Sequence, residues 1–303
     1  MSTDRQHERL WTPWRMRYIG GQAKEEGCIF CNRLHDSDDV ESLILYRGAH
    51  CFVIMNLFPY NTGHVMIVPN LHADDPSQLD ADTLHEMADL LPVVTRALKR
   101  NLNCQGFNIG LNIGSVAGAG IAEHLHEHVV PRWLGDANFM PILTSTMVIP
   151  EVIPSTYAKA RAELQREFSG NAEVRLVVLQ DDERRLLLVD GRLPVATAAQ
   201  DESIARAALA GVSAWATDLE VAGWAGANRA DDGTITGEDA GLVLRGTGTE
   251  RTSLSSHAAF APLNDATLSN LTESDRAFVQ RGLRQLAPSV MPPSAPRREP
   301  EQV

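Results

Sequence analysis

The sequence predicts two α+β units in one chain, the first an antiparallel sheet with a long helix over residues 1–150 and the second over residues 173–287. Three observations support this prediction. Short apolar runs bounded by turn residues fill the first 150 residues, one long amphipathic segment interrupts them, and the composition changes near residue 173. At 303 residues the chain also exceeds the length that a single hydrophobic core usually organises.

The first unit contains five predicted strands and one predicted helix. Apolar residues recur at helical spacing between Asp80 and Asn101, and Pro92 is expected to kink that helix. A loop of small residues, 114–120, precedes the last strand. The predicted strands are 43–47, 51–57, 64–69, 106–113 and 124–130. An aromatic N-terminal arm containing Trp11 and Trp14 is expected to dock on this unit.

The second unit follows a predicted linker, 151–172, whose helix covers residues 155–168. Asp231-Asp232-Gly233 is expected to form a hairpin turn. Residues 288–303 are rich in proline and charge, which predicts a disordered tail. The first strands of the second unit are predicted at 174–180 and 185–189, and its helices at 202–217 and 269–286.

Composition restricts the classes of partner. A net charge of −12 argues against a DNA- or RNA-binding protein, which usually presents a basic face. No run of apolar residues is long enough to span a membrane, and the polar N-terminus predicts no secretion signal. All four cysteines lie in the first third of the chain, which favours a reduced, cytoplasmic protein over a disulfide framework.

Three histidines alternate with other residues in the segment His124-Leu125-His126-Glu127-His128. In an extended strand this alternation puts all three side chains on one face, where they could bind an anion or a metal. A surface histidine cluster or an adventitious metal site is the alternative interpretation. The preceding loop favours an anion, because it offers backbone amides and polar groups for phosphate from Asn112, Gly114, Ser115, Gly118 and Gly120.

The segment HLHEHVV resembles the H-x-H-x-H-x-x signature of the histidine-triad (HIT) superfamily. Upstream, residues 56–69 (NLFPYNTGHVMIVP) resemble the strand–turn–strand of that family, and the likeness spans about residues 10–150. The segments 11–18 (WTPWRMRY) and 131–139 (PRWLGDANF) look like the bacterial branch that contains diadenosine tetraphosphate phosphorylases. The resemblance implies a HIT-like antiparallel sheet and, as in many family members, a homodimer.

The resemblance also implies roles for single residues. His126 would be the nucleophile on the α-phosphorus, and His128 would hydrogen-bond the phosphate or the leaving group. Asn56 would contact the ribose, and Asn112 would bind phosphate or orient the triad. Gly120 departs from the Gln or Ser of many relatives, which puts the leaving-group contact in doubt. His64 is interpreted as a supporting histidine rather than a catalyst.

The pair Cys28-Ile29-Phe30-Cys31 has the spacing of two thiolate ligands of one metal ion. A redox pair or coincidence is the alternative, although no βαβ context surrounds it. The resemblance to bacterial relatives implies two further ligands, His72 and His124, and thus a structural zinc. Cys51 and Cys104 are interpreted as buried apolar residues.

The leading functional hypothesis is phosphorolysis of an adenine dinucleoside polyphosphate through nucleotidylated His126. One alternative is a hydrolase acting on dinucleoside polyphosphates or phosphoramidates, which the retained His128 favours. Another is a nucleotide-binding module without catalysis. Magnesium could accompany the nucleotide. The second unit weakly resembles a Nudix fold, but its predicted helix lacks the glutamates that would hold magnesium, so any such unit would be degenerate.

Overall fold

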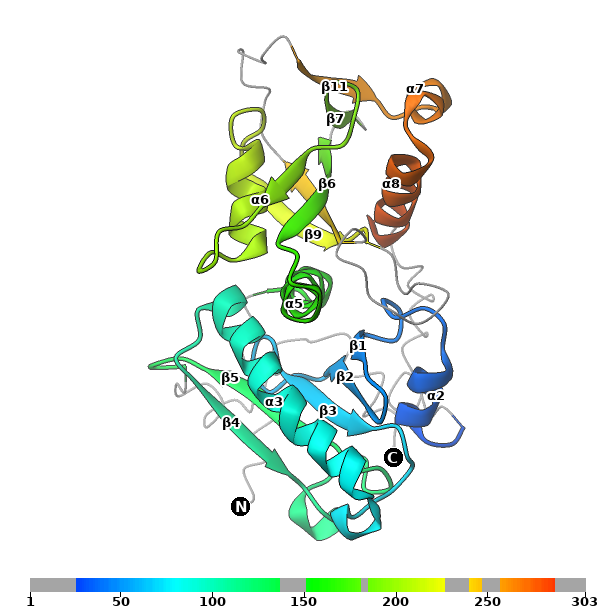
Figure 1. The fold of residues 1–303 in the computed structure, drawn as a ribbon, viewed down its shortest axis with the longest axis vertical. Helices are drawn as coiled ribbons and strands as arrows, with labels where there is room; N and C mark the ends of the chain where they lie inside the picture. Colours follow the sequence, from blue (N-terminus) through cyan, green and yellow to red (C-terminus); the bar gives the residue numbers. More distant parts are fainter. Residues whose placement is uncertain (1–25, 137–150, 181–184, 227–239, 247–256, 287–303) are drawn as a thin grey trace, which may run out of the picture.

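The computed structural model describes residues 26–136, 151–180, 185–226, 240–246 and 257–286. Two sheets lie at opposite ends of the molecule, and the helix α5 (Ile153–Ser169) runs between them (Figure 1). The expected N-terminal arm, the turn at 231–233 and the tail at 288–303 lie outside the described residues. None of the described helices is both long and apolar enough to cross a membrane.

The first sheet has five antiparallel strands in the order β1-β2-β3-β5-β4. This confirms the predicted antiparallel α+β architecture of the first unit. Every residue of β2 and of β3 is buried, because the two strands are apolar and lie in the middle of the sheet. The strands are β1 (Ile44–Arg47), β2 (Cys51–Met55), β3 (Val65–Pro69), β4 (Gly106–Leu111) and β5 (Glu127–Arg132).

The helix α3 (Ala81–Leu102) covers this sheet (Figure 1). It begins at Asp80, whose carboxylate accepts a hydrogen bond from the backbone N–H of Thr83, and it ends at Asn103 in the left-handed conformation. The helix continues through Pro92 in a single 22-residue element. A short helix, α2 (Ile29–His35), packs beside β1 and β2.

The predicted strand 124–130 is wrong at its first residues, because β5 begins only at Glu127. The ladder between β3 and β5 starts with the pair Ile67 and Glu127. Before that point the backbone N–H of Leu125 donates to the carbonyl of Ala73, in the loop that follows β3. The first two triad histidines therefore lie in a segment fixed by this loop, outside the sheet.

The predicted linker helix, α5, packs between the two sheets. Its neighbours are α3 and β1 on one side and β9 and α6 on the other. Its small residues Ala158, Ala160 and Ala162 are buried and permit this close approach. One continuous hydrophobic core therefore runs from the first sheet through α5 into the second.

The second sheet has six strands, and a parallel pair, β6 and β10, lies at its centre. Alternate residues of β6 face opposite sides: Leu176 and Val178 join the core shared with α5 and α6, whereas Val177 and Leu179 contact a second core beneath α8. The strands are β6 (Glu173–Gln180), β7 (Arg185–Val189), β8 (Val195–Thr197), β9 (Leu219–Trp224), β10 (Gly241–Gly246) and β11 (Ala258–Pro262). The helices are α6 (Ile204–Val212), α7 (Asp265–Asn270) and α8 (Glu273–Leu286). The likeness to a Nudix fold stays a prediction.

Candidate nucleotidyl-transfer site and metal centre

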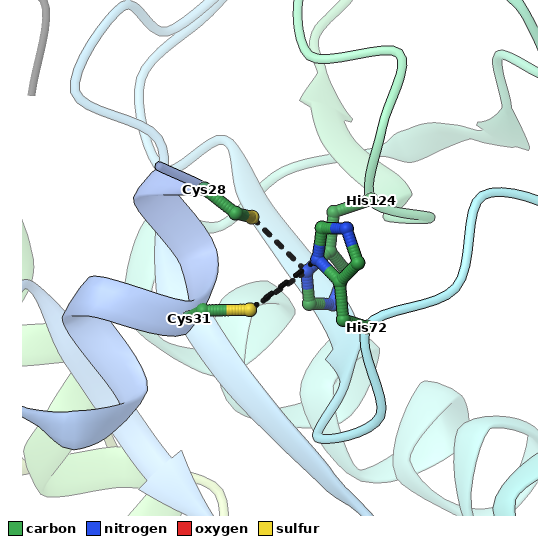
Figure 2. Close-up of side chains that lie close together, drawn as sticks. All are labelled: Cys28, Cys31, His72 and His124. Atoms are coloured by element: carbon green, nitrogen blue, oxygen red, sulfur yellow. Dashed lines mark hydrogen bonds between the residues drawn. The ribbon is translucent and has the colours of Figure 1, made fainter. Parts of the chain in front are cut away.

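Two cysteines and two histidines converge where α2 meets the triad segment. Figure 2 shows Cys28, at the N-cap of α2, and Cys31, within α2, facing two histidines. His72 comes from the loop after β3, and His124 comes from the segment before β5. The Sγ atom of Cys28 lies 3.3 Å from Nδ1 of His124, and that of Cys31 lies 3.4 Å from Nδ1 of His72. The four predicted ligand atoms all lie within 4.8 Å of one another.

These distances fit a tetrahedral metal ion. Zinc bonds of about 2.3 Å to sulfur and about 2.0–2.1 Å to nitrogen separate the sulfur and nitrogen ligands by about 3.5 Å. The Sγ atom of Cys31 also lies 3.6 Å from Nδ1 of His124. On the other side of that ring, Nε2 lies 2.9 Å from the carbonyl oxygen of Pro69. A proton on Nε2 donates to this carbonyl and leaves Nδ1 as a metal ligand.

The protonation of Cys31 depends on its surroundings. Burial, together with the neighbouring Cys28, raises the pKa of Cys31 to about 11. The Cys31 thiol by itself thus stays protonated, whereas a bound cation would stabilise its thiolate. Cys51 and Cys104 are buried and lie elsewhere in the core, as predicted.

His126 is held by one hydrogen bond from its own segment. Its Nδ1 lies 2.8 Å from the carbonyl oxygen of His124, which can only accept, so the proton of a neutral ring sits on Nδ1. Burial lowers the pKa of His126 below its usual value, although the bond to the carbonyl of His124 opposes this shift. The ring is therefore neutral near pH 7, with a lone pair on Nε2.

His128 is joined to His64 of the neighbouring segment. Nε2 of His64 lies 2.9 Å from Nδ1 of His128, and both rings are buried. The backbone N–H of Tyr60 donates to Nδ1 of His64, so the proton of neutral His64 sits on Nε2 and is donated to His128. This fixes the proton of neutral His128 on its Nε2.

Charge is disfavoured on both of these rings. Burial, assisted by the positive forms of His128 and His126, lowers the pKa of His64 to about 3. Burial and His126 lower the pKa of His128 to about 4. His64 is thus a buried hydrogen-bond partner of His128, and neutral His128 has an N–H to donate.

The structure brings some of the predicted substrate-binding residues to the triad. The side-chain amide of Asn112 lies 3.4 Å from Nε2 of His128. Asn56 is linked less directly, because its Oδ1 accepts from the backbone N–H of Phe58 while its Nδ2 lies 3.3 Å from Nδ1 of His64.

The loop glycines lie between β4 and the triad segment. Gly114 and Gly118 have φ angles of +76° and +87°, a conformation that favours glycine. Ser115 begins a single turn of 3-10 helix between them. In the described part of the chain, no hydrogen bond joins these three residues to a triad histidine, so their contact with phosphate stays a prediction.

Two aromatic residues contribute to the site in ways that the sequence analysis did not assign. The ring of Phe30, between the two cysteines, has its centroid 5.1 Å from that of His126 and 5.4 Å from that of His124. The ring of Tyr60 lies 4.7 Å from His64 and is half exposed. The sequence could have indicated both residues, because Phe30 lies inside the Cys-x-x-C pair and Tyr60 lies inside the segment 56–69.

Comparison with known proteins identifies the family. Residues 37–133 match the HIT domain family. A protein of Mycobacterium tuberculosis named AP-4-A phosphorylase is 38% identical over 172 residues, which cover 54% of this chain and 87% of that protein. An uncharacterized HIT-like protein of Saccharolobus solfataricus is 30% identical and covers 37% of this chain and 79% of its own length. The chain therefore belongs to the HIT, or histidine-triad, family.

Among the solved structures that this chain is similar to is the zinc-bound histidine triad family protein of Mycobacterium smegmatis. It is 27% identical, covers 46% of this chain and 94% of its own chain, and superposes with a TM-score of 0.38.

Proposed function

We propose that this chain is a nucleotidyl-transferring enzyme that cleaves diadenosine tetraphosphate with inorganic phosphate, giving ADP and ATP. The observation that carries the proposal is the hydrogen bond between Nδ1 of His126 and the carbonyl of His124. It directs the lone pair of a neutral imidazole to Nε2, where the ring needs no base before it attacks. The name of the M. tuberculosis relative supports the choice of substrate and acceptor.

The reaction takes place in two displacements. Nε2 of His126 forms a bond to the α-phosphorus of one adenosine, and the bond from that phosphorus to the bridging oxygen breaks, which releases ATP. An oxygen of inorganic phosphate then attacks the same phosphorus, the bond to Nε2 breaks, and ADP leaves. Each displacement is easier than a direct transfer, because imidazole is both a good nucleophile and a good leaving group.

His128 has a distinct role in both displacements. Its Nε2–H is fixed by the bond from His64 to its Nδ1, so it donates to a non-bridging or bridging phosphate oxygen. Such a donor is most valuable where negative charge grows in the transition state. The amide of Asn112, 3.4 Å from that nitrogen, would hold the same phosphate.

We also propose that Cys28, Cys31, His72 and His124 hold a zinc ion. The donor set and the distances between ligand atoms support this assignment. When bound, zinc supplies structure: it ties α2 to the triad segment through four ligands. Among the described residues, the cluster suited to a metal ion is this Cys/His set, whose sulfur and nitrogen donors suit zinc rather than magnesium. A magnesium ion would enter the site bound to the substrate phosphates.

The proposal is tested by the products that the wild type and His126→Ala form from diadenosine tetraphosphate, with and without phosphate. We expect ADP and ATP only when phosphate is present, and a loss of at least about 10³-fold in His126→Ala, because the nucleophile is gone. His85→Gln is the matched control, since His85 is exposed on α3 and its loss should leave turnover unchanged.

Each other product pattern has a defined meaning. If AMP and ATP form in the absence of phosphate, water is the acceptor and the enzyme is a hydrolase rather than a phosphorylase. Binding of the dinucleotide without turnover by the wild type would overturn both enzymes and leave a nucleotide-binding module. Full activity in His126→Ala would remove His126 from the mechanism.

A further inference from the structure

The helix α2 needs support from outside its own sequence. It has seven residues, no side-chain cap at its N-terminus and no acidic residue in its first turn. A helix this short is unstable by itself. It nevertheless presents Cys28 and Cys31 to the metal cluster and Phe30 to the ring of His126. Whatever holds α2 in place therefore positions two of the four metal ligands and one side of the His126 ring.

Arg47 of β1 holds the C-terminal end of α2. Its guanidinium donates to the backbone carbonyls of Leu34 and Asp36, the latter at 2.7 Å, and more weakly to that of Arg33 at 3.4 Å. These carbonyls lie at the C-terminal end of the helix, where a positive charge is favourable. Nε of Arg47 also pairs with Oδ1 of Asp39 at 2.7 Å.

Asp39 connects this end of α2 to the centre of the molecule. Its other carboxylate oxygen, Oδ2, pairs with Arg161 of α5 at 3.1 Å. The side chains of Asp39 and Arg161 are only 5% and 3% exposed. Arg161 also donates to the carbonyl of Ile44 and to the hydroxyl of Tyr157.

Arg161 reaches the second sheet as well. Its guanidinium carbon lies 5.5 Å from the centre of the Trp224 ring of β9, and that ring is buried. A continuous series of contacts thus runs from Trp224 through Arg161, Asp39 and Arg47 to the carbonyls of α2. Asp39 and Arg161 are buried and Arg47 is 11% exposed, and the one carboxylate of Asp39 pairs with both guanidiniums. Removing Arg161 therefore leaves Asp39 paired with Arg47 alone, whereas removing the charge of Asp39 leaves two arginines without their carboxylate.

We propose that Arg161 and Arg47 are positioning residues through which the second half of the chain holds α2 against the triad. The inference rests on the proposed metal centre and nucleotidyl transfer, because it concerns the helix that carries two metal ligands. The second sheet and α5 are then part of the catalytic unit, although they contribute no ligand and no nucleophile.

The test compares Arg161→Met with Arg100→Met in the zinc-loaded full chain. Arg100 is the matched control, because it also pairs with α5, through Glu163 at 2.9 Å and Glu167 at 2.7 Å, but joins it to α3 rather than to α2. Three quantities are measured at a temperature where both variants are folded. They are the rate of zinc release to a chromophoric chelator, hydrogen exchange of the α2 amides, and the thiolate-to-cobalt absorption bands of the cobalt(II) form.

We expect zinc release to be at least about tenfold faster in Arg161→Met, because α2, which carries Cys31, opens more often once its connection to α5 is weakened. Exchange of the α2 amides should rise and the cobalt bands should change in the same variant, while Arg100→Met matches the wild type in all three. Asp39→Asn, which keeps the size of the side chain but removes the charge that both arginines share, should show the same effects and serves if Arg161→Met does not fold.

Equal zinc release and equal α2 exchange in the two arginine variants would overturn the inference, because α5 would then stabilise the whole molecule without acting on α2. A wild-type protein that binds no zinc would instead overturn the metal centre. Inactivity of the wild type on the dinucleotide would count against the proposed reaction and leave the exchange comparison intact.

Discussion

His64 and His128 share one hydrogen bond, and neither ring can take a proton without disturbing it. Nδ1 of His64 already accepts from the backbone N–H of Tyr60, so the ring has no free acceptor for a proton. A proton arriving at Nδ1 of His128 would face the N–H of His64. Burial and this arrangement together explain why the pKa values of the two rings fall to about 3 and about 4.

This pair predicts a loss of stability in acid. Above pH 6.5 both rings are neutral in the folded and in the unfolded chain, and the stabilisation is complete. Between pH 6.5 and about 4 the unfolded chain binds protons that the folded chain does not, so the free energy of unfolding decreases as the pH falls. Each such proton contributes a slope of about 1.4 kcal/mol per pH unit.

We expect His64→Gln to reduce the pH slope of the free energy of unfolding by the contribution of about one proton, or about 1.4 kcal/mol per pH unit. Urea denaturation at pH 7, 6 and 5 measures this slope. His85→Gln, on the exposed face of α3, should keep the wild-type slope. An unchanged slope in His64→Gln would mean that His64 is already protonated in the folded protein.

At this scale the sequence predicted which four side chains form the metal-ligating cluster. The alternating histidines and the Cys-x-x-C pair are local patterns, and the structure brings the four predicted metal ligands together. The link between His64 and His128 was not predicted, because it depends on the pairing of β3 with β5, which puts Met66 opposite His128. The register between two strands that are distant in sequence cannot be read from the spacing of residues along the chain.

At the scale of elements, α6 illustrates how a helix end is stabilised. The hydroxyl of Ser203 accepts from the backbone N–H of Arg206, and Ser203 is buried. The N–H of Ile204 donates to a carboxylate of α5, Oε1 of Glu163, at 2.7 Å. The first turn of α6 therefore obtains one partner from its own cap and one from the central helix.

Ser203→Ala should lower the free energy of unfolding by about 1 kcal/mol, because it leaves the N–H of Arg206 without its partner. Ser213→Ala, at the exposed C-terminal end of the same helix, should change it by less than about 0.5 kcal/mol. Denaturation followed by far-ultraviolet circular dichroism gives both values. Equal losses in the two variants would show that the cap of Ser203 contributes no more than a surface hydroxyl.

The role of α5 could not be predicted from its sequence. Arg161, Glu163 and Gln165 give the segment the polarity of an exposed linker, yet all three are buried. Their partners are distant: Asp39 pairs with Arg161, and Arg100 pairs with Glu163. A local pattern of polar residues cannot distinguish charges that face water from charges that face partners 60 or more positions away.

At the scale of the whole molecule, the two sheets share one hydrophobic core through α5. Leu45 of β1 and Leu176 of β6 belong to the same buried cluster, as does Tyr157 between them. Glu163 adds a polar connection, because it contacts α3 through Arg100 and α6 through Ile204. The sequence predicted two units, and the structure joins them through a common helix.

We therefore expect the described parts of both units to unfold in one transition. Differential scanning calorimetry of the zinc-loaded protein should give a single peak whose calorimetric and van't Hoff enthalpies agree. Two well-separated peaks would contradict a shared core. A variant that overpacks α5, Ala160→Leu, should shift the single peak to lower temperature without splitting it.

The position of α5 also has a consequence for synthesis of the chain. The ribosome completes β1–β5 and α3 before residues 153–169 emerge, and the second sheet follows later still. Until then, the apolar side chains that α5 will cover remain open to water and to other nascent chains. The first unit carries every residue of the proposed reaction, yet it would reach its mature form only after the central helix has been translated. A chaperone that shields the uncovered apolar face in the interval would protect the growing chain.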